Sequence, residues 1–325
     1  MNAGILSTGC DYPKGVLTNA DLEQMVETSD EWITTRTGIR ERRKAAPDEY
    51  TSQFAVRAGR QAIERAGLKP EDIEIIVCAT TTPDQILPST GCLIQRDLGC
   101  VNAAGMDVFA ACSGFIYGIT MVESMIRTGQ IRFGLVIGAE VLTKYVDYTD
   151  RTTCVIFGDG AGAAVLGPVE DGKGILATKI LSDGNYEERL YARGGGTKLG
   201  TTHETIDSKE HYFKMRGNEI FKVAVRNMSG ISKEMLDRAG LTVEDVDLVI
   251  PHQANQRITD AVAKKLGVDP EKVYSNIDRM GNTSSASIPI ALDEVMQSGR
   301  VKEGDVVLLT AFGGGITWGA TVIRF

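Results

Sequence analysis

Two related segments, 173 residues apart, constrain this chain more than any other feature of its sequence. Residues 66–68 read Ala-Gly-Leu and lead through an acidic turn into the apolar run 75–77. Residues 239–241 repeat Ala-Gly-Leu and lead through a similar turn into the apolar run 248–250. Each segment is typical of a helix end with a glycine cap, followed by a buried strand. The repeat predicts a duplicated α/β chain, and a ligand crevice beyond the carboxyl ends of its strands.

Length and composition agree with such a duplication. A chain of 325 residues is long enough to bury two cores, and we expect the halves to cover residues 1–172 and 173–325. The net charge of −8 argues against a dedicated nucleic-acid binder. No apolar run reaches the length of a membrane span, and residues 1–5 lack the pattern of a secretory signal. The six cysteines show no zinc-ligand spacing, so we expect free thiols, no metal and a reducing cytoplasm.

Hydrophobic periodicity predicts alternating strands and helices along both halves. Strands are expected over residues 4–10, 73–80, 106–109, 133–137, 246–250, 305–311 and 317–324. Helices are expected over residues 20–27, 55–65, 88–98, 114–127, 218–239, 256–266 and 285–297, with a further short one beginning at residues 29–30. The glycine-rich stretch 155–166 is expected to form a hairpin, and residues 193–197 a surface turn.

Cys112 lies where a predicted strand turns into a predicted helix. Backbone N–H groups and the helix dipole at such a position stabilise a thiolate and lower the pKa of the thiol. Cysteines are more often small buried hydrophobic residues, and this is the interpretation that we favour for the other five. For Cys112 the structural and nucleophilic interpretations both stay open on position alone.

Two polar residues of the second half are candidates for a site with Cys112. His252, one of three histidines, follows the repeated strand, although a single histidine is often structural. Asn282 stands in a Gly-Asn-Thr-Ser loop before a predicted helix, where it either caps the helix or donates its side-chain N–H to a developing oxyanion. The turn 312–315 reads Phe-Gly-Gly-Gly, and a backbone N–H from it, paired with that of Cys112, would make an oxyanion hole.

Other interpretations explain less. The run 157–162 superficially resembles a dinucleotide-binding loop, but the residues after it read as a strand instead of a helix. The order Cys, His, Asn also suits a papain-like protease, which leaves the duplication unexplained and lacks the usual sequence around the cysteine. Five basic residues fall within 36–44, and they fit either a solvated surface or a site for a phosphate or an acidic partner.

Taken together, the motifs make the whole chain resemble the β-ketoacyl-acyl-carrier-protein synthase III family, the initiating condensing enzymes of type II fatty acid synthesis. The resemblance lies in the joint order of the segments 28–33, 36–42, 111–115, 150–152, 157–162, 251–255, 281–284 and 312–315. It implies an α/β thiolase-like fold in which the pseudo-duplicated halves form αβαβα layers with mixed five-stranded sheets, and a homodimer. It also implies a decarboxylative condensation of a short acyl-CoA with malonyl-acyl-carrier-protein. The acyl-CoA thioester is a substrate, and no cofactor is implied.

The resemblance also assigns roles to residues. Cys112 is implied as nucleophile, with its own N–H and that of Gly314 as oxyanion hole, and His252 and Asn282 as donors to the enolate. The implied coenzyme A site comprises Thr28, Trp32, Arg36, Thr37, Arg151 and Asn255. The implied acyl pocket comprises Leu87, Leu142 and Phe157, and the implied carrier-protein face comprises Lys222, Arg257, Lys264 and Lys265.

Some points stay open at this stage. Leu87 stands where family members restricted to acetyl primers often have Phe, which suggests longer or branched primers. The polar insertion 197–211 has no functional interpretation. A related condensing or acyl-transferring enzyme of secondary metabolism, and an inactive acyl-CoA-binding relative, are the alternatives; the presence of Cys112, His252 and Asn282 argues against the inactive one.

Overall fold

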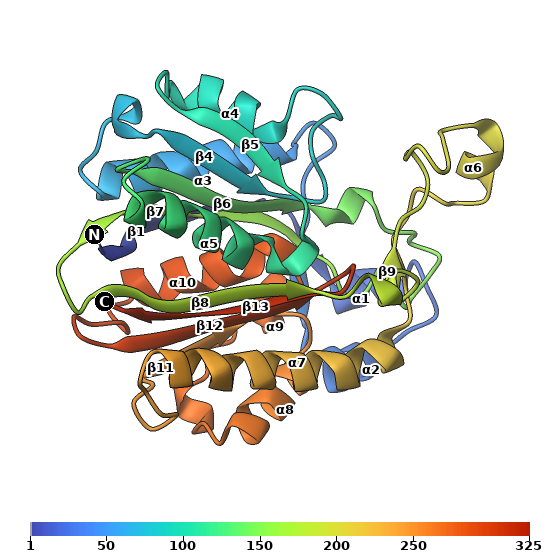
Figure 1. Ribbon diagram of the computed structural model, residues 1–325. Helices are drawn as coiled ribbons and strands as arrows, with labels where there is room; N and C mark the ends of the chain where they lie inside the picture. Colours follow the sequence, from blue (N-terminus) through green and yellow to red (C-terminus); the bar gives the residue numbers. More distant parts are fainter. Residues whose placement is uncertain (1) are drawn as a thin grey trace.

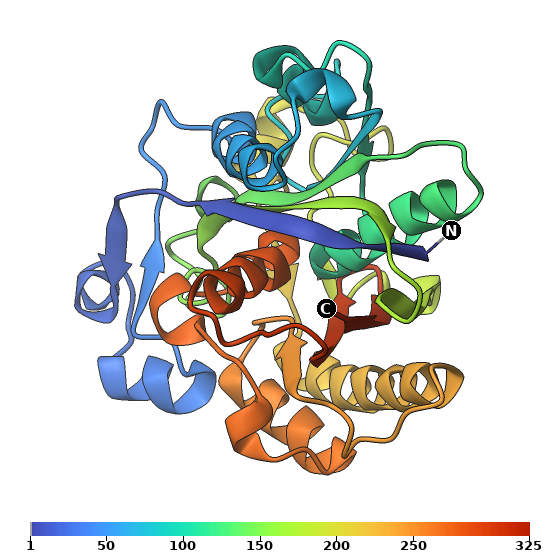
Figure 2. The same cartoon turned by 90° about the vertical axis from the view of Figure 1, so that its left-hand side faces the viewer.

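Five layers, stacked helix–sheet–helix–sheet–helix, make up the body of the molecule (Figure 1). The structure is a computed structural model that describes residues 2–325, with the backbone alone described for Asn218. Figure 2 shows the same layers from the side, with strand β1 running across the first sheet. The layering confirms the α/β duplication predicted from the repeat.

The first sheet has five strands in the order β1-β7-β6-β4-β5, and the second has four in the order β11-β12-β13-β8. The first comprises β1 (Asn2–Asp11), β4 (Ile75–Ala79), β5 (Ala104–Val108), β6 (Gly134–Val141) and β7 (Asp159–Val169). The second comprises β8 (Gly174–Ser182), β11 (Leu248–Pro251), β12 (Val306–Gly313) and β13 (Thr317–Arg324). All strands of the first sheet thus precede residue 172 and all strands of the second follow it, while the division into two folding units stays a prediction.

The two sheets have matching strand directions. β4 runs parallel to β5 and β6 in the first sheet, and β7 is antiparallel to β6 and β1. In the second sheet β11 runs parallel to β12, and β13 is antiparallel to β12 and β8. The expected fifth strand of the second sheet is wrong: its place beside β11 is taken by a single parallel bridge between Val249 and Val273.

Helices cover both sheets and fill the space between them. The outer layers are formed by α3 (Thr51–Arg65) and α4 (Thr90–Leu98) on the first sheet, and by α7 (Gly217–Arg238) and α8 (Gln256–Leu266) on the second. The middle layer is formed by α5 (Gly114–Arg127) and α10 (Ser287–Gln297). The buried face of α5 repeats at helical spacing, with Phe115, Ile119, Val122 and Ile126 fully buried in the central core.

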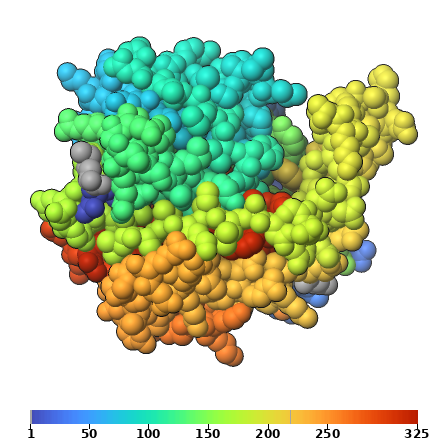
Figure 3. Space-filling model, in the orientation of Figure 1, coloured from blue at the N-terminus to red at the C-terminus, as the bar shows by residue number. Residues whose placement is uncertain are grey.

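Shorter elements surround the ends of the strands near the site. They are β2 (Val16–Thr18), α1 (Asn19–Glu23), α2 (Asp30–Thr37), β3 (Glu41–Arg43), β9 (Leu190–Tyr191), α6 (His203–Asp207), β10 (Lys214–Met215) and α9 (Ile277–Met280). The predicted insertion 197–211 forms an arm that carries α6 and projects from the body, as the space-filling view shows (Figure 3).

The hairpin predicted over residues 155–166 is wrong, because this stretch is a turn followed by the long strand β7. The glycines in it serve close packing instead of chain reversal. A Cβ atom on Gly162 would lie 2.5 Å from the backbone nitrogen of Ile290, so α10 rests directly on the backbone of β7. The rejection of a dinucleotide-binding loop here is confirmed, since the glycines do not lead into a helix.

Candidate active site

A cavity of about 600 Å³ lies where strand ends of the two halves meet. Its walls come from α2, the ribbon of β9 and β10, the first turns of α7 and α8, and the turn between β12 and β13. Cys112, His252, Asn282 and Gly314 all line it. The structure thus brings together four residues that are up to 202 positions apart in the sequence (112 against 314).

Cys112 is positioned by a tight turn between β5 and α5. The turn begins at Ala111, whose φ of 46° is unusual for a residue with a side chain. The Cys112 sulfur is hydrogen-bonded by its own N–H and by the N–H of Gly314. The two backbones touch, since a Cβ atom on Gly313 would lie 2.7 Å from the nitrogen of Cys112. Two N–H groups, one from each half of the chain, therefore converge on the same sulfur.

The protonation state of Cys112 differs from the sequence prediction. Burial raises the pKa of its thiol to about 12, although hydrogen bonds from Ser284 and from the two N–H groups lower it. The side chain is only 7% exposed, so loss of hydration outweighs the donors around the sulfur. The expectation of a lowered pKa was wrong because a helix terminus in the sequence does not reveal how deeply the thiol is buried. At neutral pH the group is a thiol.

His252 lies directly after β11 and is buried, with 1% exposure. Its Nδ1 is 2.6 Å from the hydroxyl oxygen of Ser287, at the start of α10. Its Nε2 has no hydrogen-bond partner among the described residues. Burial lowers the pKa of the ring to about 3, so the imidazole is neutral at pH 7. A neutral ring has one donor and one acceptor nitrogen, and the nitrogen without a partner is the one available to a ligand.

Asn282 is held by its backbone and by one end of its side chain. Its N–H donates to the carbonyl of Ile156, and its carbonyl accepts from the N–H of Gly158, both at 3.0 Å. Its side-chain Oδ1 accepts from the N–H of Ser284 at 2.8 Å. This bond fixes the orientation of the amide, because only the oxygen can accept. The Nδ2 donor is left for the cavity.

The described residues contain no group of three or more His, Cys, Asp or Glu side chains arranged to hold a metal ion. The polar atoms that face the cavity near Cys112 are backbone N–H groups, an amide and a neutral imidazole. Such a set stabilises negative charge on an oxygen of a ligand.

Known proteins are similar to this chain over nearly its whole length. Family models for 3-oxoacyl-[acyl-carrier-protein (ACP)] synthase III match residues 106–184, and those for its C-terminal part match residues 236–325. The β-ketoacyl-[acyl-carrier-protein] synthase III of Caldanaerobacter subterraneus subsp. tengcongensis is 52% identical over 99% of this chain and 98% of its own length. The chain belongs to the β-ketoacyl-acyl-carrier-protein synthase III family.

Solved structures agree with this assignment. The crystal structure of 3-oxoacyl-[acyl-carrier-protein] synthase III from Aquifex aeolicus VF5 has a TM-score of 0.93 and 49% identity, covering 99% of this chain and 100% of that one. The priming β-ketosynthase of the R1128 polyketide pathway also has a TM-score of 0.93, at 34% identity, covering 100% and 96%. The chain therefore has the predicted thiolase-like fold and is a condensing acyltransferase that initiates fatty acid synthesis.

The mouth of the cavity in this family member is aromatic and cationic. The guanidinium carbons of Arg36 and Arg151 lie 4.6 Å and 4.9 Å from the centroid of the Trp32 ring. Arg151 also donates to the carbonyl of Glu27 at 2.9 Å. With Arg151 on the ring, an aromatic base can stack on that face of Trp32 only after the guanidinium moves aside. Thr28 lies nearby in sequence, but it does not line the cavity.

Thr37 and Asn255 line the cavity, but hydrogen bonds within the protein already engage their side chains. The Thr37 hydroxyl donates to the carbonyl of Ile33 at 2.6 Å. Asn255 caps α8 by accepting from the N–H of Arg257 at 2.9 Å, and its amide donates to the carbonyl of Arg36 at 2.9 Å. The bond from Asn255 to Arg36 ties α8 to α2, and so fixes two walls of the cavity relative to each other.

The three residues expected in the acyl pocket occupy different places. Phe157 lines the cavity and forms a backbone bridge with Asn282. Leu142 is buried in the same hydrophobic cluster as Phe157 and does not line the cavity. Leu87 is 84% exposed and does not line the cavity within one chain.

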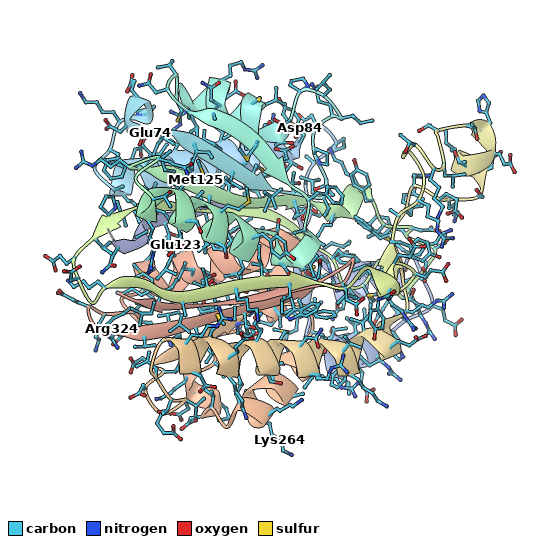
Figure 4. The ribbon with its side chains drawn as sticks, viewed as in Figure 1. Glu74, Asp84, Glu123, Met125, Lys264 and Arg324 are labelled. Atoms are coloured by element: carbon cyan, nitrogen blue, oxygen red, sulfur yellow. The ribbon has the colours of Figure 1, made fainter. Side chains whose placement is uncertain are left out.

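The basic residues expected to bind a carrier protein divide into two pairs. Lys222 and Arg257 line the mouth of the cavity, on α7 and α8. Lys264 and Lys265 lie in the last turn of α8, and Figure 4 shows Lys264 extending outward from the outer helix layer. The second pair is therefore about 10 Å further along the helix from Arg257.

The basic run 36–44 matches neither of the two interpretations as a whole. Arg42 is fully buried, and it donates to the carbonyls of Leu17 and Val155 and to the side chain of Asn19. Burial lowers the pKa of its guanidinium to about 10. Only Arg36, among the five, lines the cavity.

Sequence reasoning missed several residues of the site. Leu190 and Met215 face each other across the ribbon of β9 and β10, and both line the cavity. The ring of Phe213 lies 5.8 Å from that of Phe157 and ties the base of the arm to the cavity wall. Ser287 contacts His252. The position of Ser287 at a predicted helix start near Asn282 could have indicated a place close to the site. Nothing in the sequence indicates that Leu190, Phe213 and Met215 lie there.

Proposed function

We propose that the chain condenses a short acyl-CoA with malonyl-acyl-carrier-protein to give 3-oxoacyl-acyl-carrier-protein, CO₂ and coenzyme A. The observation that carries this proposal is the convergence of two N–H groups on the Cys112 sulfur, beside the neutral His252 and the free amide end of Asn282. One cavity thus offers a nucleophile and two separate sets of donors for negative oxygen. A condensation in two stages needs both sets.

In the first stage Cys112 accepts the acyl group. Its sulfur attacks the thioester carbonyl carbon, and the N–H groups of Cys112 and Gly314 donate hydrogen bonds to the negative oxygen that forms. The carbon–sulfur bond to coenzyme A then breaks, and coenzyme A leaves with the proton that Cys112 gives up. Because the resting group is a thiol, this proton transfer is part of the stage.

In the second stage the malonyl thioester loses CO₂. The electron pair of the broken carbon–carbon bond moves into an enolate, whose oxygen accepts hydrogen bonds from His252 Nε2–H and Asn282 Nδ2–H. The enolate carbon attacks the acyl carbon on Cys112, the carbon–sulfur bond to Cys112 breaks, and the sulfur takes up a proton from solvent to return to the thiol. Hydrogen-bond donors alone carry the charge, so no metal or cofactor is part of the proposal.

The mouth of the cavity suits the substrates of this proposal. Trp32, Arg36 and Arg151 offer an aromatic face and two cations for the adenine and phosphates of coenzyme A. Thr28, Thr37 and Asn255 belong to the proposed coenzyme A path through their place beside this mouth, with Thr28 outside the cavity wall. Lys222 and Arg257 at the mouth, and Lys264 and Lys265 along α8, present positive charge to an acidic carrier protein.

We also propose a homodimer that pairs through the β5 edge of the first sheet. β5 is the end strand in the order of that sheet. Val101 and Phe109, on either side of it, are 71% and 77% exposed, and Ile86 and Leu87 are 90% and 84% exposed. A second copy would cover this apolar surface. Leu87 would then approach the acyl pocket of the partner, and its size would admit longer or branched primers.

The compartment that we propose is the reducing cytoplasm, since all six cysteines are free thiols. Separately, the described residues 2–325 include no helix that is both long and apolar enough to cross a membrane.

A panel of acyl-CoA substrates tests the proposal. The protein is incubated with each, and intact mass and peptide mapping then locate the adduct. We expect one acyl group on Cys112, lost in Cys112→Ala and kept in the matched variant Cys92→Ala, whose thiol is exposed. Addition of malonyl-acyl-carrier-protein then releases CO₂ and 3-oxoacyl product. An adduct on another cysteine contradicts the assignment of the nucleophile. A strict acetyl preference that Leu87→Phe leaves unchanged contradicts the role of Leu87.

A second candidate is a priming condensing enzyme of secondary metabolism, which the likeness to the R1128 enzyme favours. The two candidates share the proposed acylation of Cys112. Product formation with carrier proteins from fatty acid and from polyketide systems separates them.

A further inference from the structure

We propose that Ser287 is a positioning residue that keeps the proton of the neutral His252 ring on Nε2. The inference rests on the proposed function, in which Nε2–H donates to the enolate oxygen. Neutral imidazole exists in two tautomers, and only one has its donor on Nε2. The structure contains a hydroxyl that discriminates between them.

The contact that selects the tautomer is short and buried. The Ser287 hydroxyl oxygen lies 2.6 Å from His252 Nδ1, and Ser287 and His252 are 2% and 1% exposed. His252 lines the cavity, and its Nε2 has no partner among the described residues. Nδ1 is therefore engaged by the protein, whereas Nε2 is left for a ligand.

The direction of the hydrogen bond follows from the other contacts of the hydroxyl. Its oxygen already accepts from the backbone N–H of Gln253 at 3.3 Å. A serine at this place in a helix often donates to the carbonyl four residues earlier, which here belongs to Thr283. That carbonyl accepts from the N–H of Ala286 instead. Among the described residues, His252 Nδ1 is therefore the acceptor to which the Ser287 hydroxyl donates its proton. Nδ1 must then lack a proton, and Nε2 must carry it.

The first half of the chain shows that packing alone does not require this serine. The residues 173 positions before Ser287 and His252 are Gly114 and Ala79. A Cβ atom on Gly114 would lie 2.7 Å from the Cβ atom of Ala79, so that helix start has no side chain. The hydroxyl occurs in the half that carries the histidine.

Nitrogen NMR of the ring reads the tautomer directly. The chain has three histidines, so a His203→Asn, His211→Asn protein labelled with ¹⁵N-histidine reports His252 alone. We expect one protonated nitrogen, Nε2, and one unprotonated nitrogen, Nδ1. Ser287→Ala should shift both signals toward a mixture of tautomers, and Ser287→Thr, which keeps the hydroxyl, should restore them. The matched control is Ser232→Ala, which removes a buried hydroxyl on α7 that has no partner among the described residues.

Kinetics of the two stages give the second readout. Ser287→Ala should slow the condensation of acyl-Cys112 with malonyl-acyl-carrier-protein by about tenfold or more. This loss is smaller than the loss of about 10²- to 10³-fold that follows removal of an oxyanion donor. Formation of acyl-Cys112 should stay within about twofold, since His252 takes no part in it, and Ser287→Thr should recover the second stage.

Two outcomes overturn the inference. One is an unchanged tautomer in Ser287→Ala. The other is an equal loss of both stages that Ser287→Thr does not repair, which indicates a structural role. If the unsubstituted protein performs no condensation although its Nε2 is protonated, the proposed function fails, and the tautomer assignment stands on the NMR result.

Discussion

The two tight turns that precede α5 and α10 have the same backbone and different chemistry. Ala111 and Ser284 are 173 residues apart, and their φ angles are 46° and 50°. The residues that follow them are Cys112 and Ser285. The sulfur of Cys112 faces the cavity, while the hydroxyl of Ser285 is 2.7 Å from the carbonyl of Ala79 and 3.1 Å from Glu140. The two halves thus share a strained turn, which holds the proposed reactive atom in the first half and makes a structural contact in the second.

The ends of the strands β11 and β4 show the opposite difference between the halves: the second half has the proposed functional side chain there, and the first half does not. His252 follows β11 in the second half, and Ala79 ends β4 at the corresponding position in the first. The proposed nucleophile and the imidazole therefore come from different copies of the repeat. The proposed active site is therefore one site assembled from two unequal halves instead of two copies of a site.

Glu140 is one of the two groups that Ser285 contacts in place of the cavity. Its carboxylate is fully buried, and it accepts hydrogen bonds from the N–H of Thr81 and from the hydroxyls of Thr82 and Ser285. Burial raises the pKa of this carboxyl group. No Lys, Arg or His side chain pairs with it among the described residues. Ser285 is thus one of several neutral donors that hold a buried carboxylate between the halves.

Exchanging the two side chains is the strongest test of this comparison. Cys112→Ser should lower acyl transfer by on the order of 10³-fold or more, because a hydroxyl is a much weaker nucleophile than a thiol at neutral pH. Ser285→Cys should gain no acyl adduct, since its side chain faces Ala79 and Glu140 and is 1% exposed. Intact mass after incubation with acetyl-CoA measures both variants. An adduct on residue 285 would show that the halves are less different than the structure indicates.

The donor from the second half can be tested with Asn282→Asp. The aspartate keeps an oxygen that accepts from the N–H of Ser284, but a second oxygen replaces the Nδ2 donor. We expect condensation to fall by about 10²- to 10³-fold, with formation of acyl-Cys112 retained. Separate assays of acyl-adduct formation and CO₂ release measure the two stages. Equal loss in both assays would argue against the division of labour between the halves.

Ser285→Ala tests whether the contact of Ser285 with Ala79 and Glu140 stabilises the fold. The variant leaves a buried carbonyl and a buried carboxylate with one donor fewer, so the free energy of unfolding should fall by about 1–3 kcal/mol. Urea denaturation measures it, with Ser232→Ala as the control that removes an unpartnered buried hydroxyl. A change in Ser285→Ala no larger than in the control contradicts the role given to this contact.

His252 makes the free energy of unfolding depend on pH, and the expected change per pH unit is smaller than the effects of the substitutions above. Its pKa is about 3 in the folded chain and about 6.5 in an unfolded one. Below pH 6.5 the unfolded state therefore binds a proton that the folded state does not, and stability falls as pH falls. The slope is at most about 1.4 kcal/mol per pH unit.

His252→Asn isolates this effect. Burial also raises the pKa of Asp159 to about 6, which disfavours its ionised form in the folded state. As pH falls through this range Asp159 takes up a proton in the folded state first, and this contribution opposes the slope from His252. The difference in unfolding free energy between the two proteins cancels the contribution of Asp159. It should change steadily between pH 6.5 and pH 5, and a constant difference contradicts the lowered pKa of His252.

Local sequence patterns predicted the elements with strong periodicity. The helix 256–266 and the strand 317–324 match α8 and β13 residue for residue, because an amphipathic repeat and a clear cap or turn bound each of them. The turn that carries Cys112 was also predicted, from its position between a strand and a helix. The order of motifs, and not any one of them, indicated the family.

Properties that depend on contacts between distant segments were not predictable. Burial reversed the expected pKa shift of Cys112, and it placed Arg42 inside the protein although its neighbours in sequence are charged. Ser287 and His252 are 35 residues apart, so their contact exists only after α10 packs beside β11. The glycines of 158–162 gave the wrong prediction of a hairpin because the helix that needs their small size comes 130 residues later in the chain (290 against 160).

The contact between Gly313 and Cys112 has a consequence for how activity arises during synthesis of the chain. The two N–H groups on the Cys112 sulfur belong to residues 112 and 314, so a nascent polypeptide that ends before the final hairpin lacks half of the proposed oxyanion hole. Fragments produced separately from the two parts of the gene should be inert toward thioesters, and complementation between them should restore acylation. Reactivity of this cysteine thus reports completion of the fold.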